Sequence, residues 1–392
     1  MKPKIALIIS HPIQHFCPQY VSFARQDTIQ FKVFFASMLG YKTYFDPNFG
    51  KHIEWGNLEL DKFEHEFLNG EAVIPADKYI DAPNLEERLE AYAPDCVITY
   101  GYFQRLQRRA YKWCKKKQIS IAYIADSERK QLRNRLMEWI KYPWLKQYLS
   151  RIDFFLTVGD ANEDYYRFYG VNEKRFIRMH FPIDVQQYEA AYRNKTELRE
   201  YVRNQYGIAP QEKVACVVGK LVPWKNQTHI IEAMKLLERQ NIHMHLFILG
   251  SGLEMEALKA NAATLQKSKV YFPGFVKIED LPAFYAASDF YIHPASIEPH
   301  SIAISEAIFM GCPVIVSDRT GSFGENDDVE EGMNGYVYPF GDIDALSTRI
   351  KSLICFPEES KKMSEYSHAL GAKFQRISHH DVIYELTHRL GK

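Results

Sequence analysis

Short runs of apolar residues recur along the chain between longer segments with helical spacing. Each run is apolar throughout, which is typical of strands in a parallel sheet that helices cover on both faces. The alternation of strands and helices predicts an α/β protein with two doubly wound, Rossmann-like domains. The predicted strands are Lys4–Ile9, Phe31–Phe35, Cys96–Tyr100, Ser120–Ile124 and Phe154–Val158 in the first half, and Val214–Val218, His245–Leu249, Asp289–His293 and Pro313–Ser317 in the second.

The length of 392 residues suits two domains of about 150–200 residues each. The sequence changes character at Phe181-Pro182-Ile183-Asp184, after which a polar, helix-like stretch, Tyr188–Tyr206, follows. We place the domain junction there, with an N-terminal domain over residues 1–183 and a C-terminal domain over residues 184–373.

The composition is that of a globular protein, with 46% hydrophobic and 25% charged residues, and it excludes a disordered or fibrous chain. Lys+Arg and Asp+Glu both number 49, so the chain as a whole lacks the basic excess of nucleic-acid-binding proteins. The six cysteines lie far apart without a C-x-x-C pair, which disfavours a zinc ribbon or a disulfide framework and favours reduced cysteines in a core. No apolar stretch reaches the roughly 18 residues of a membrane-spanning helix, and the start, MKPKIALIISHPIQHF, fits a first strand better than a signal peptide. We therefore expect a cytoplasmic protein.

Charge is unevenly distributed in the first half. Residues 44–99 hold 4 basic and 13 acidic side chains, whereas residues 100–151 hold 14 basic and 3 acidic ones, with aromatic residues interleaved. Two solvated helices would explain this pattern, and so would a face that contacts an anionic membrane. The bases include Arg105, Arg108, Arg109, Lys115, Lys116, Lys117, Arg129, Lys130, Arg133 and Arg135, and the aromatics are Trp113, Trp139, Tyr142, Trp144 and Tyr148.

Two cations stand at the carboxyl end of a predicted strand. Lys220 and Lys225 follow Val214–Val218, and a helix is predicted from Thr228. Ligands of α/β domains bind at this edge of the sheet. A helix N-terminus and lysine side chains both favour an anion such as phosphate. The alternative is a solvated turn.

The next strand ends in Leu249-Gly250-Ser251-Gly252. The full G-x-G-x-x-G pattern fails because Met255 stands where its third glycine would be, so a dinucleotide fingerprint is not supported. A tight turn explains these glycines as well as a nucleotide contact does.

Candidate residues are densest in the segment Pro294–Ala307. Glu298 follows a predicted strand, and Glu306 lies about one and a half turns into a helix that begins near Ser301 and stops at Gly311. The spacing of the two glutamates alone can arise by chance. In this context, however, the helix N-terminus can bind a diphosphate while the carboxylates accept hydrogen bonds from hydroxyls on either side. A ligand with hydroxyl, diphosphate and hydroxyl groups in that order is a nucleotide sugar.

At these residues the second half resembles the donor domain of glycosyltransferase family 4, a family of retaining enzymes with GT-B architecture. Glu298 to Glu306 is similar to the family's E-x7-E motif, and Gly311–Ser317 is similar to the G-x-P-V-V-x-S that follows it. The resemblance covers residues 210–350. Further matches are Phe272–Val276, Leu281, Tyr285, Asp289, Pro294, Gly332–Val337 and Gly341–Leu346.

The resemblance implies a role for each matching residue. Lys220 and Lys225 occupy positions that bind the diphosphate, Lys220 standing where arginine is usual. Glu306 occupies the position that accepts from the ribose hydroxyls, and Glu298 the one that contacts the donor sugar. The remaining donor-binding positions are His300, Ser301 and Ile302 on the phosphate loop, Gly250, and Phe275 and Val276 beside the base.

The first half is similar to one bacterial subgroup, which begins with a strand and the motif S-H-P-I-Q, here Ser10–Gln14. The family's usual Gly-Gly is missing from this loop, so we expect His11 and Gln14 to make side-chain contacts instead. A strand-end histidine without a ligand is the alternative for His11. Asp126, in the subgroup's D-S pair, ends a predicted strand that faces the same cleft and is the better candidate.

The resemblance implies a GT-B fold whose final helix, residues 374–392, crosses back to the N-terminal domain. It also implies retaining transfer of a sugar from a nucleotide diphosphate sugar to a hydroxyl, by a front-face mechanism in which the leaving phosphate helps to deprotonate the acceptor. A UDP-sugar is favoured, with a GDP-sugar as the alternative. No cofactor besides the donor and no metal is expected. The expected acceptor is a lipid-linked or cell-envelope glycan, with peripheral contact to an anionic membrane through residues 100–151.

In this interpretation Lys220 and Lys225 stabilise the diphosphate, while Glu298, Asp126 and His11 orient the two sugars. Two other classes remain open. One is a non-catalytic nucleotide- or sugar-binding protein on the same fold. The other is a different two-domain α/β enzyme, such as a nucleotide-sugar epimerase or a dehydrogenase. The missing glycine fingerprint disfavours the dehydrogenase.

Two further motifs have plain explanations. Asp342-Ile343-Asp344 is a D-x-D, but it precedes a predicted helix, which favours helix capping over a metal site. His379-His380-Asp381 lies in a predicted C-terminal helix, Ser378–Leu390, without a third ligand at useful spacing. A surface or interdomain helix is therefore expected there.

Overall fold

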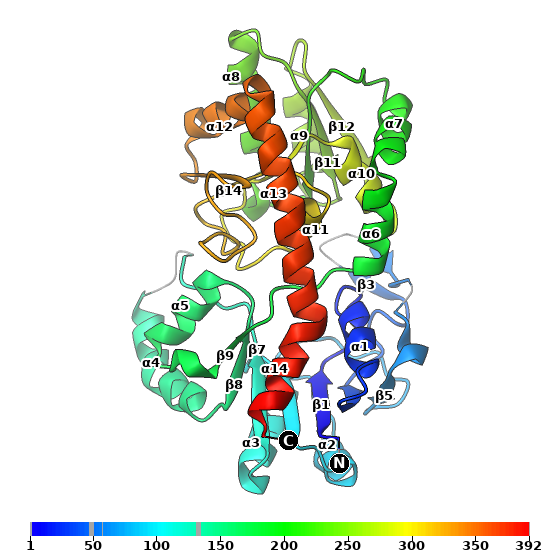
Figure 1. The fold of residues 1–392 in the computed structure, drawn as a ribbon, viewed down its shortest axis with the longest axis vertical. Coiled ribbons are helices and arrows are strands. Elements are labelled where there is room, and N and C mark those ends of the chain that lie inside the picture. Colours follow the sequence, from blue (N-terminus) through cyan, green and yellow to red (C-terminus); the bar gives the residue numbers. More distant parts are fainter. Residues whose placement is uncertain (1, 47–50, 57, 131–134, 392) are drawn as a thin grey trace.

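The computed structural model describes residues 2–46, 51–56, 58–130 and 135–391. Two parallel sheets dominate it, one in each half of the chain (Figure 1). The first sheet has the order β5-β2-β1-β6-β7-β8-β9. Its strands are β1 (Lys4–Ile9), β2 (Gln30–Phe35), β5 (Glu64–Phe67), β6 (Cys96–Tyr100), β7 (Ser120–Ile124), β8 (Phe154–Thr157) and β9 (Phe176–Arg178), and a separate hairpin pairs β3 (Tyr44–Asp46) with β4 (Lys51–Ile53).

The second sheet has the order β12-β11-β10-β13-β14-β15. Its strands are β10 (Val214–Val218), β11 (His245–Leu249), β12 (Lys269–Gly274), β13 (Phe290–His293), β14 (Val314–Ser317) and β15 (Gly335–Tyr338).

Helices follow most of the strands, as expected of doubly wound domains. In the first half they are α1 (Cys17–Ala24), η1 (Leu60–Lys62), α2 (Leu85–Tyr92), α3 (Arg105–Lys117), α4 (Arg135–Ser150), α5 (Asp160–Phe168) and η2 (Glu173–Arg175). In the second half they are α6 (Val185–Arg193), α7 (Lys195–Gln205), η3 (Pro223–Lys225), α8 (Thr228–Arg239), α9 (Met255–Ala262), α10 (Leu281–Ala287), α11 (Ile302–Phe309), α12 (Ile343–Cys355), α13 (Pro357–Arg376), η4 (Ile377–Asp381) and α14 (Val382–Arg389).

The nine strands predicted from apolar runs are confirmed to within one residue at either end. The apolar pattern arises because each strand is buried on both faces: Ile5 and Leu7 of β1 pack in one core cluster, and Ala6 and Ile8 in another. In the two parallel sheets the pattern did not predict β5, β9, β12 and β15, which lie at sheet edges where one side has no neighbouring strand and a fully apolar run is not required.

Three local predictions can be compared with the structure. The polar stretch Tyr188–Tyr206 forms two helices rather than one, because Asn194 ends α6. Asp342 caps α12, its carboxylate accepting from the Ala345 amide at 2.8 Å, so the capping prediction for the D-x-D is confirmed. All six cysteines are free, and all but Cys355 are buried. Within the described ranges, no helix has both the length and the apolarity that crossing a bilayer requires.

The last helices run from the second sheet to the first (Figure 1). The π-helical turn η4 joins α13 to α14, and Gln375 bonds the backbone of the chain's other crossing at Phe181 and Ile183, both at 2.9 Å. The buried His379 donates from Nε2 to the Ile183 carbonyl at 3.0 Å. His379 of the His379-His380-Asp381 motif therefore joins the two segments that cross between the halves of the chain.

A second contact between the halves lies on the side of α5. The Asp160 amide donates to Asp327 at 2.8 Å, the Asn326 amide donates to Asp160 at 3.0 Å, and Arg178 donates to the Asn326 carbonyl at 2.8 Å. A Cβ on Gly159 would collide with the Asp327 carboxylate, so a larger residue there would have to displace that carboxylate.

The packing of α14 predicts a specific loss of stability. Leu386 is fully buried in the core cluster of β1, whereas Tyr384 on the same helix is 65% exposed. Leu386→Ala should lower the free energy of unfolding by about 2–5 kcal/mol, because it removes buried methyl groups and leaves a cavity. Chemical denaturation followed by circular dichroism measures this, with Tyr384→Ala as the control. Equal stability of the two variants would contradict the packing of α14.

Candidate active site

Two adjoining cavities lie between the sheets, where the carboxyl ends of strands from both halves meet. Cavity A, of about 740 Å³, has on its first-half side Tyr100 at the end of β6, Gly101 directly after it, and Asp126 after β7. Cavity B, of about 750 Å³, lies beside the ends of β11 and β12. His15, Val218 and Gly219 line both cavities. An extended ligand could therefore occupy the two together.

Cavity A gathers most of the residues predicted to handle the diphosphate and the sugar. Its C-terminal wall consists of Lys220, Lys225, Glu298, His300, Ser301 and Ile302. Asp126 faces them from the other half of the chain. Two cations, a carboxylate and the start of a helix thus share one space.

Lys225 and Glu298 form an ion pair in this cavity, although η3 and the loop after β13 are far apart in sequence. Glu298 also accepts a hydrogen bond from the Nε2 of His293 at 2.9 Å. Burial disfavours the charge on Glu298, but His293 and Lys225 outweigh it and lower the pKa of Glu298 to about 2. The carboxylate is therefore ionised at neutral pH.

Ser301 precedes α11 and its amide donates to the Ser322 hydroxyl at 3.0 Å. The residues that follow it have the free backbone amides of a helix N-terminus. These amides, the helix dipole and the two lysines make cavity A attractive to an anion.

Among the described residues, one group of three metal-ligating side chains lies close together: His300, Asp327 and Asp328. The Nε2 of His300 is 3.5 Å from Asp327 and 3.6 Å from Asp328. Burial lowers the pKa of His300, but the two facing carboxylates outweigh it and the net shift is upward. The two carboxylates therefore favour the charged form of the imidazole, and a charged imidazole would in turn balance part of their negative charge.

Glu306 lines neither cavity. It is 4% exposed, and its carboxylate accepts from the Tyr285 hydroxyl at 2.7 Å. Burial raises the pKa of Glu306 to about 7, although the hydroxyls of Tyr285 and Tyr188 favour its charged form. Its role toward a ribose stays a prediction.

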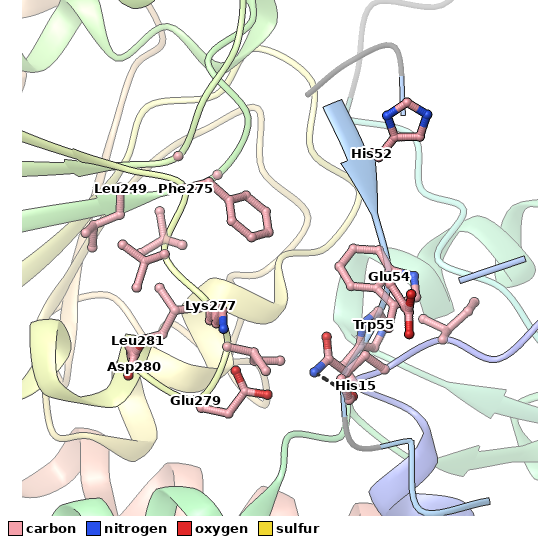
Figure 2. Close-up of a pocket in the computed structure, with 18 residues that line it drawn as sticks. His15, His52, Glu54, Trp55, Leu249, Phe275, Lys277, Glu279, Asp280 and Leu281 are labelled. Carbon is pink, nitrogen blue, oxygen red and sulfur yellow. Dashed lines mark hydrogen bonds between the residues drawn. The ribbon is translucent and has the colours of Figure 1, made fainter. Parts of the chain in front are cut away.

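Cavity B holds the other predicted donor positions, Gly250, Phe275, Val276 and Gln14. Figure 2 shows Phe275 on one wall, with His15, Glu54 and Trp55 across from it. Gly250 has a φ of +147°, and a Cβ there would collide with the Gly219 carbonyl. Only glycine allows the ends of β10 and β11 to approach so closely.

His11 is not among the residues that line either cavity. Its Nδ1 bonds the Ser10 hydroxyl at 2.9 Å, and burial lowers its pKa to about 4. His15, four residues later, lines both cavities, and burial followed by the proximity of His11 lowers its pKa to about 3. Sequence reasoning missed His15, which stands one residue past the S-H-P-I-Q motif.

His293 was also missed. Its signal in the sequence is weak: a histidine at the end of an apolar strand, five residues before Glu298. Trp55 was missed because it lies in a connection without an apolar run or a glycine motif. Neither residue belongs to the patterns from which the site was predicted.

Two Rossmann-like domains of parallel strands, with a polar site between them, define the GT-B fold. The solved structures agree. HepE of Anabaena in complex with UDP superimposes with a TM-score of 0.71 over 98% of this chain and 100% of that chain, at 16% identity. WaaG, a glycosyltransferase involved in lipopolysaccharide biosynthesis, gives 0.62 over 98% and 99%, also at 16% identity.

Residues 199–369 match the family model of glycosyl transferases group 1. A GDP-mannose-dependent phosphatidylinositol monomannoside mannosyltransferase of Mycolicibacterium smegmatis is 31% identical over 175 residues, 43% of this chain and 45% of the relative. A UDP-Gal:GlcNAc-diphosphoundecaprenol galactosyltransferase of Escherichia coli is 31% identical over 166 residues, 42% and 41%. The matches thus span about half or less of these relatives.

The buried carboxyl of Glu306 predicts a pH-dependent stability. Its pKa is about 7 in the folded chain against an ordinary value of 4.5, so the folded state holds a proton that the unfolded state releases. The stability from this group is complete below pH 4.5 and is lost as the pH rises to 7, by about 3 kcal/mol. Glu306→Gln cannot ionise and should lack this loss.

Denaturant unfolding of wild type and Glu306→Gln at pH 5 and pH 8 measures the difference. Glu200→Gln, an exposed glutamate on α7, is the matched control. A constant difference between wild type and Glu306→Gln at the two pH values would contradict the raised pKa.

Proposed function

We propose that the protein is a retaining glycosyltransferase that moves a sugar from a nucleotide diphosphate sugar to a hydroxyl group of a glycan. One observation carries the proposal: Lys220, Lys225, Glu298 and the N-terminus of α11 meet in one cavity that faces Asp126 of the other half. Two cations and a helix start suit a diphosphate, while carboxylates suit sugar hydroxyls. The group 1 family match over residues 199–369 supports this class of reaction.

The two cavities suggest how the donor lies. In this proposal the diphosphate binds beside Lys220, Lys225 and α11 in cavity A. The nucleoside extends past Gly219 into cavity B, toward Phe275 and Val276. The sugar remains in cavity A between Glu298 and Asp126, where the acceptor also enters.

Transfer breaks the bond between the anomeric carbon and the phosphate oxygen and forms a bond to the acceptor oxygen on the same face of the sugar. The acceptor proton passes to the leaving phosphate. Negative charge grows on the diphosphate, and the two lysines and the helix dipole stabilise it. Since these groups supply positive charge at the leaving group, we propose that the reaction requires neither a metal nor an enzyme nucleophile.

We propose a UDP-sugar as the donor, with a GDP-sugar as the alternative. HepE, which shares the fold over nearly the whole chain, has been crystallised with UDP and with UDP-glucose. The mannosyltransferase relative is named as GDP-mannose-dependent.

We propose further that the acceptor is a lipid-linked or cell-envelope glycan, because both curated relatives act on lipid-bound acceptors by name. Ion pairs in residues 100–151 favour a smaller contact surface than the whole segment. Five predicted bases pair with carboxylates, so much of the charge in residues 100–151 is balanced. The pairs are Arg105–Asp81, Arg109–Glu86, Lys115–Asp153, Lys117–Glu90 and Arg129–Glu138.

On α4, by contrast with these paired bases, large apolar side chains are exposed to solvent. Trp139 is 79% exposed and Ile140 61%, and Lys141 beside them has no acidic partner among the described residues. Arg133 lies outside the described residues, as does the side chain of Arg135. We therefore centre the membrane contact on Trp139, Ile140 and Lys141, because large apolar side chains beside a base favour the bilayer interface.

The ion pair in cavity A gives opposite predictions for its two partners. Lys225→Ala removes a charge-assisted contact and should weaken UDP binding by about 1.5–3 kcal/mol. Glu298→Gln removes the internal competitor for Lys225, so UDP should bind at least as tightly while sugar transfer is lost. Isothermal titration with UDP and GDP measures this, with Lys235→Ala, a surface lysine paired with Glu232, as the control. Equal affinities of wild type and Lys225→Ala would sink the proposed diphosphate site.

The membrane contact predicts binding to anionic vesicles through α4. Trp139→Ser with Ile140→Ser should reduce co-sedimentation with phosphatidylglycerol vesicles at least about tenfold, since each large apolar side chain contributes about 1.5–3 kcal/mol when buried. Tyr201→Ser, a 61% exposed aromatic on α7, is the control. Wild-type protein that ignores anionic vesicles at low salt would rule out the membrane contact and leave the transfer reaction untouched.

A further inference from the structure

Glu298 has a second partner in the buried His293, which lies at the end of β13. Its side chain is 2% exposed, and it does not line cavity A. Nε2 bonds Glu298 at 2.9 Å, and Nδ1 bonds the Tyr291 hydroxyl at 3.0 Å. The imidazole therefore links a buried tyrosine to the carboxylate in the site.

The protonation state of His293 follows from its surroundings. Burial is the main cause that lowers its pKa, in spite of the hydrogen bond to Glu298. A neutral imidazole has one N–H. The ionised Glu298 can only accept, so that N–H is on Nε2 and points at Glu298. Nδ1 then accepts from the Tyr291 hydroxyl, which also lies 3.4 Å from the Val218 carbonyl.

Both partners of Glu298 use the same oxygen. Lys225 and His293 each bond Oε2, and neither bond involves Oε1. Glu298 is thus held from one side, by one cation that lines the cavity and one neutral donor that does not.

A bound nucleotide sugar would affect Lys225 and His293 differently. A diphosphate carries more negative charge than a carboxylate and attracts Lys225 away from Glu298. A carboxylate with a side chain only 14% exposed that loses its cation takes up a proton or turns toward water unless another donor holds it. His293 cannot follow the diphosphate, because it lies in β13 and is fixed by Tyr291.

We propose that His293 is a positioning residue that keeps Glu298 ionised and oriented toward the donor sugar while Lys225 passes from Glu298 to the diphosphate. This inference rests on the proposed function. It assigns the ion pair to the empty site and the His293–Glu298 bond to both the empty and the loaded site. His293 then acts on sugar transfer and not on nucleotide affinity.

Two variants separate hydrogen bonding from packing. His293→Phe keeps a ring of similar size and removes the donor, whereas His293→Gln keeps an N–H near the position of Nε2. The matched control is His245→Phe, which replaces another buried strand histidine near a glutamate, Glu212, outside both cavities. The probes are UDP for binding, and UDP-glucose and GDP-mannose for transfer or donor hydrolysis.

We expect His293→Phe to bind UDP as wild type does and to lose about 10- to 100-fold in kcat, the range for a lost hydrogen bond to a charged group. The acid limb of its pH–rate profile should move to higher pH, because the pKa of Glu298 rises without the His293 bond. His293→Gln should recover most of the rate, and His245→Phe should match wild type. An unchanged kcat, a UDP affinity that falls with kcat, or no recovery in His293→Gln overturns the proposal.

A second measurement, of stability against pH, needs no nucleotide sugar. The lowered pKa of Glu298 contributes stability that is complete above pH 4.5 and is lost as the pH falls toward 2. The difference in unfolding free energy between His293→Gln, which keeps an N–H donor, and His293→Phe, which removes it, should therefore shrink from pH 6 to pH 3. Neither glutamine nor phenylalanine titrates, so in a Glu298→Gln background this difference should not change with pH, and a pH-independent difference in both backgrounds overturns the link.

The two experiments distinguish the failure of this inference from the failure of the proposed function. If neither UDP nor GDP binds the wild-type protein, the glycosyltransferase proposal fails, while the stability measurement still decides whether His293 controls the charge of Glu298. If UDP binds and transfer is insensitive to His293→Phe, the proposed function stands and the positioning role is wrong.

Discussion

The site depends on one constraint: the strands of each sheet run parallel, so their loops all emerge at the same edge. Register alone brings Gly101 after β6 and Asp126 after β7 to one side, and Lys220 after β10 and Glu298 after β13 to the other. Residues almost two hundred positions apart thereby face each other without any local motif that joins them. The same constraint leaves the turns at this edge free to carry chemistry, since apolar side chains of the strands and of the helices that cover them fill the cores.

Burial of charge is the second constraint that shapes the site. Lys225 and Glu298 are each less than a fifth exposed, and burying either charge without a partner would be costly. Their pairing stabilises the empty cleft, and it also means that a ligand binds by replacing one partner rather than by filling a vacant positive site. Glu306 shows the opposite solution: it has hydroxyl partners but no cation, and its pKa rises to about 7.

The fold was predictable from sequence wherever burial on both faces made a strand apolar throughout, as in β1 and β10. It was not predictable at the sheet edges, where β5 alternates charged and aromatic residues. In the site, the C-terminal residues followed from a motif whose spacing mirrors a strand–loop–helix unit. His15 and His293 did not, because a single histidine beside a strand has no spacing to distinguish it. Only the three-dimensional contacts show that one lines both cavities and that the other holds Glu298.

The paired crossings of the chain have a mechanical consequence. The backbone passes between the two halves at Ile183 and returns at η4, and Gln375 and His379 bond these passages to each other. Two halves that are joined at one place in this way resist sliding and separation but can still rotate about that place. The contacts of Asp160 with Asn326 and Asp327 would limit such a rotation. A change in the width of the cleft would therefore bend the chain at these two crossings and break the contacts of Asp160 with Asn326 and Asp327.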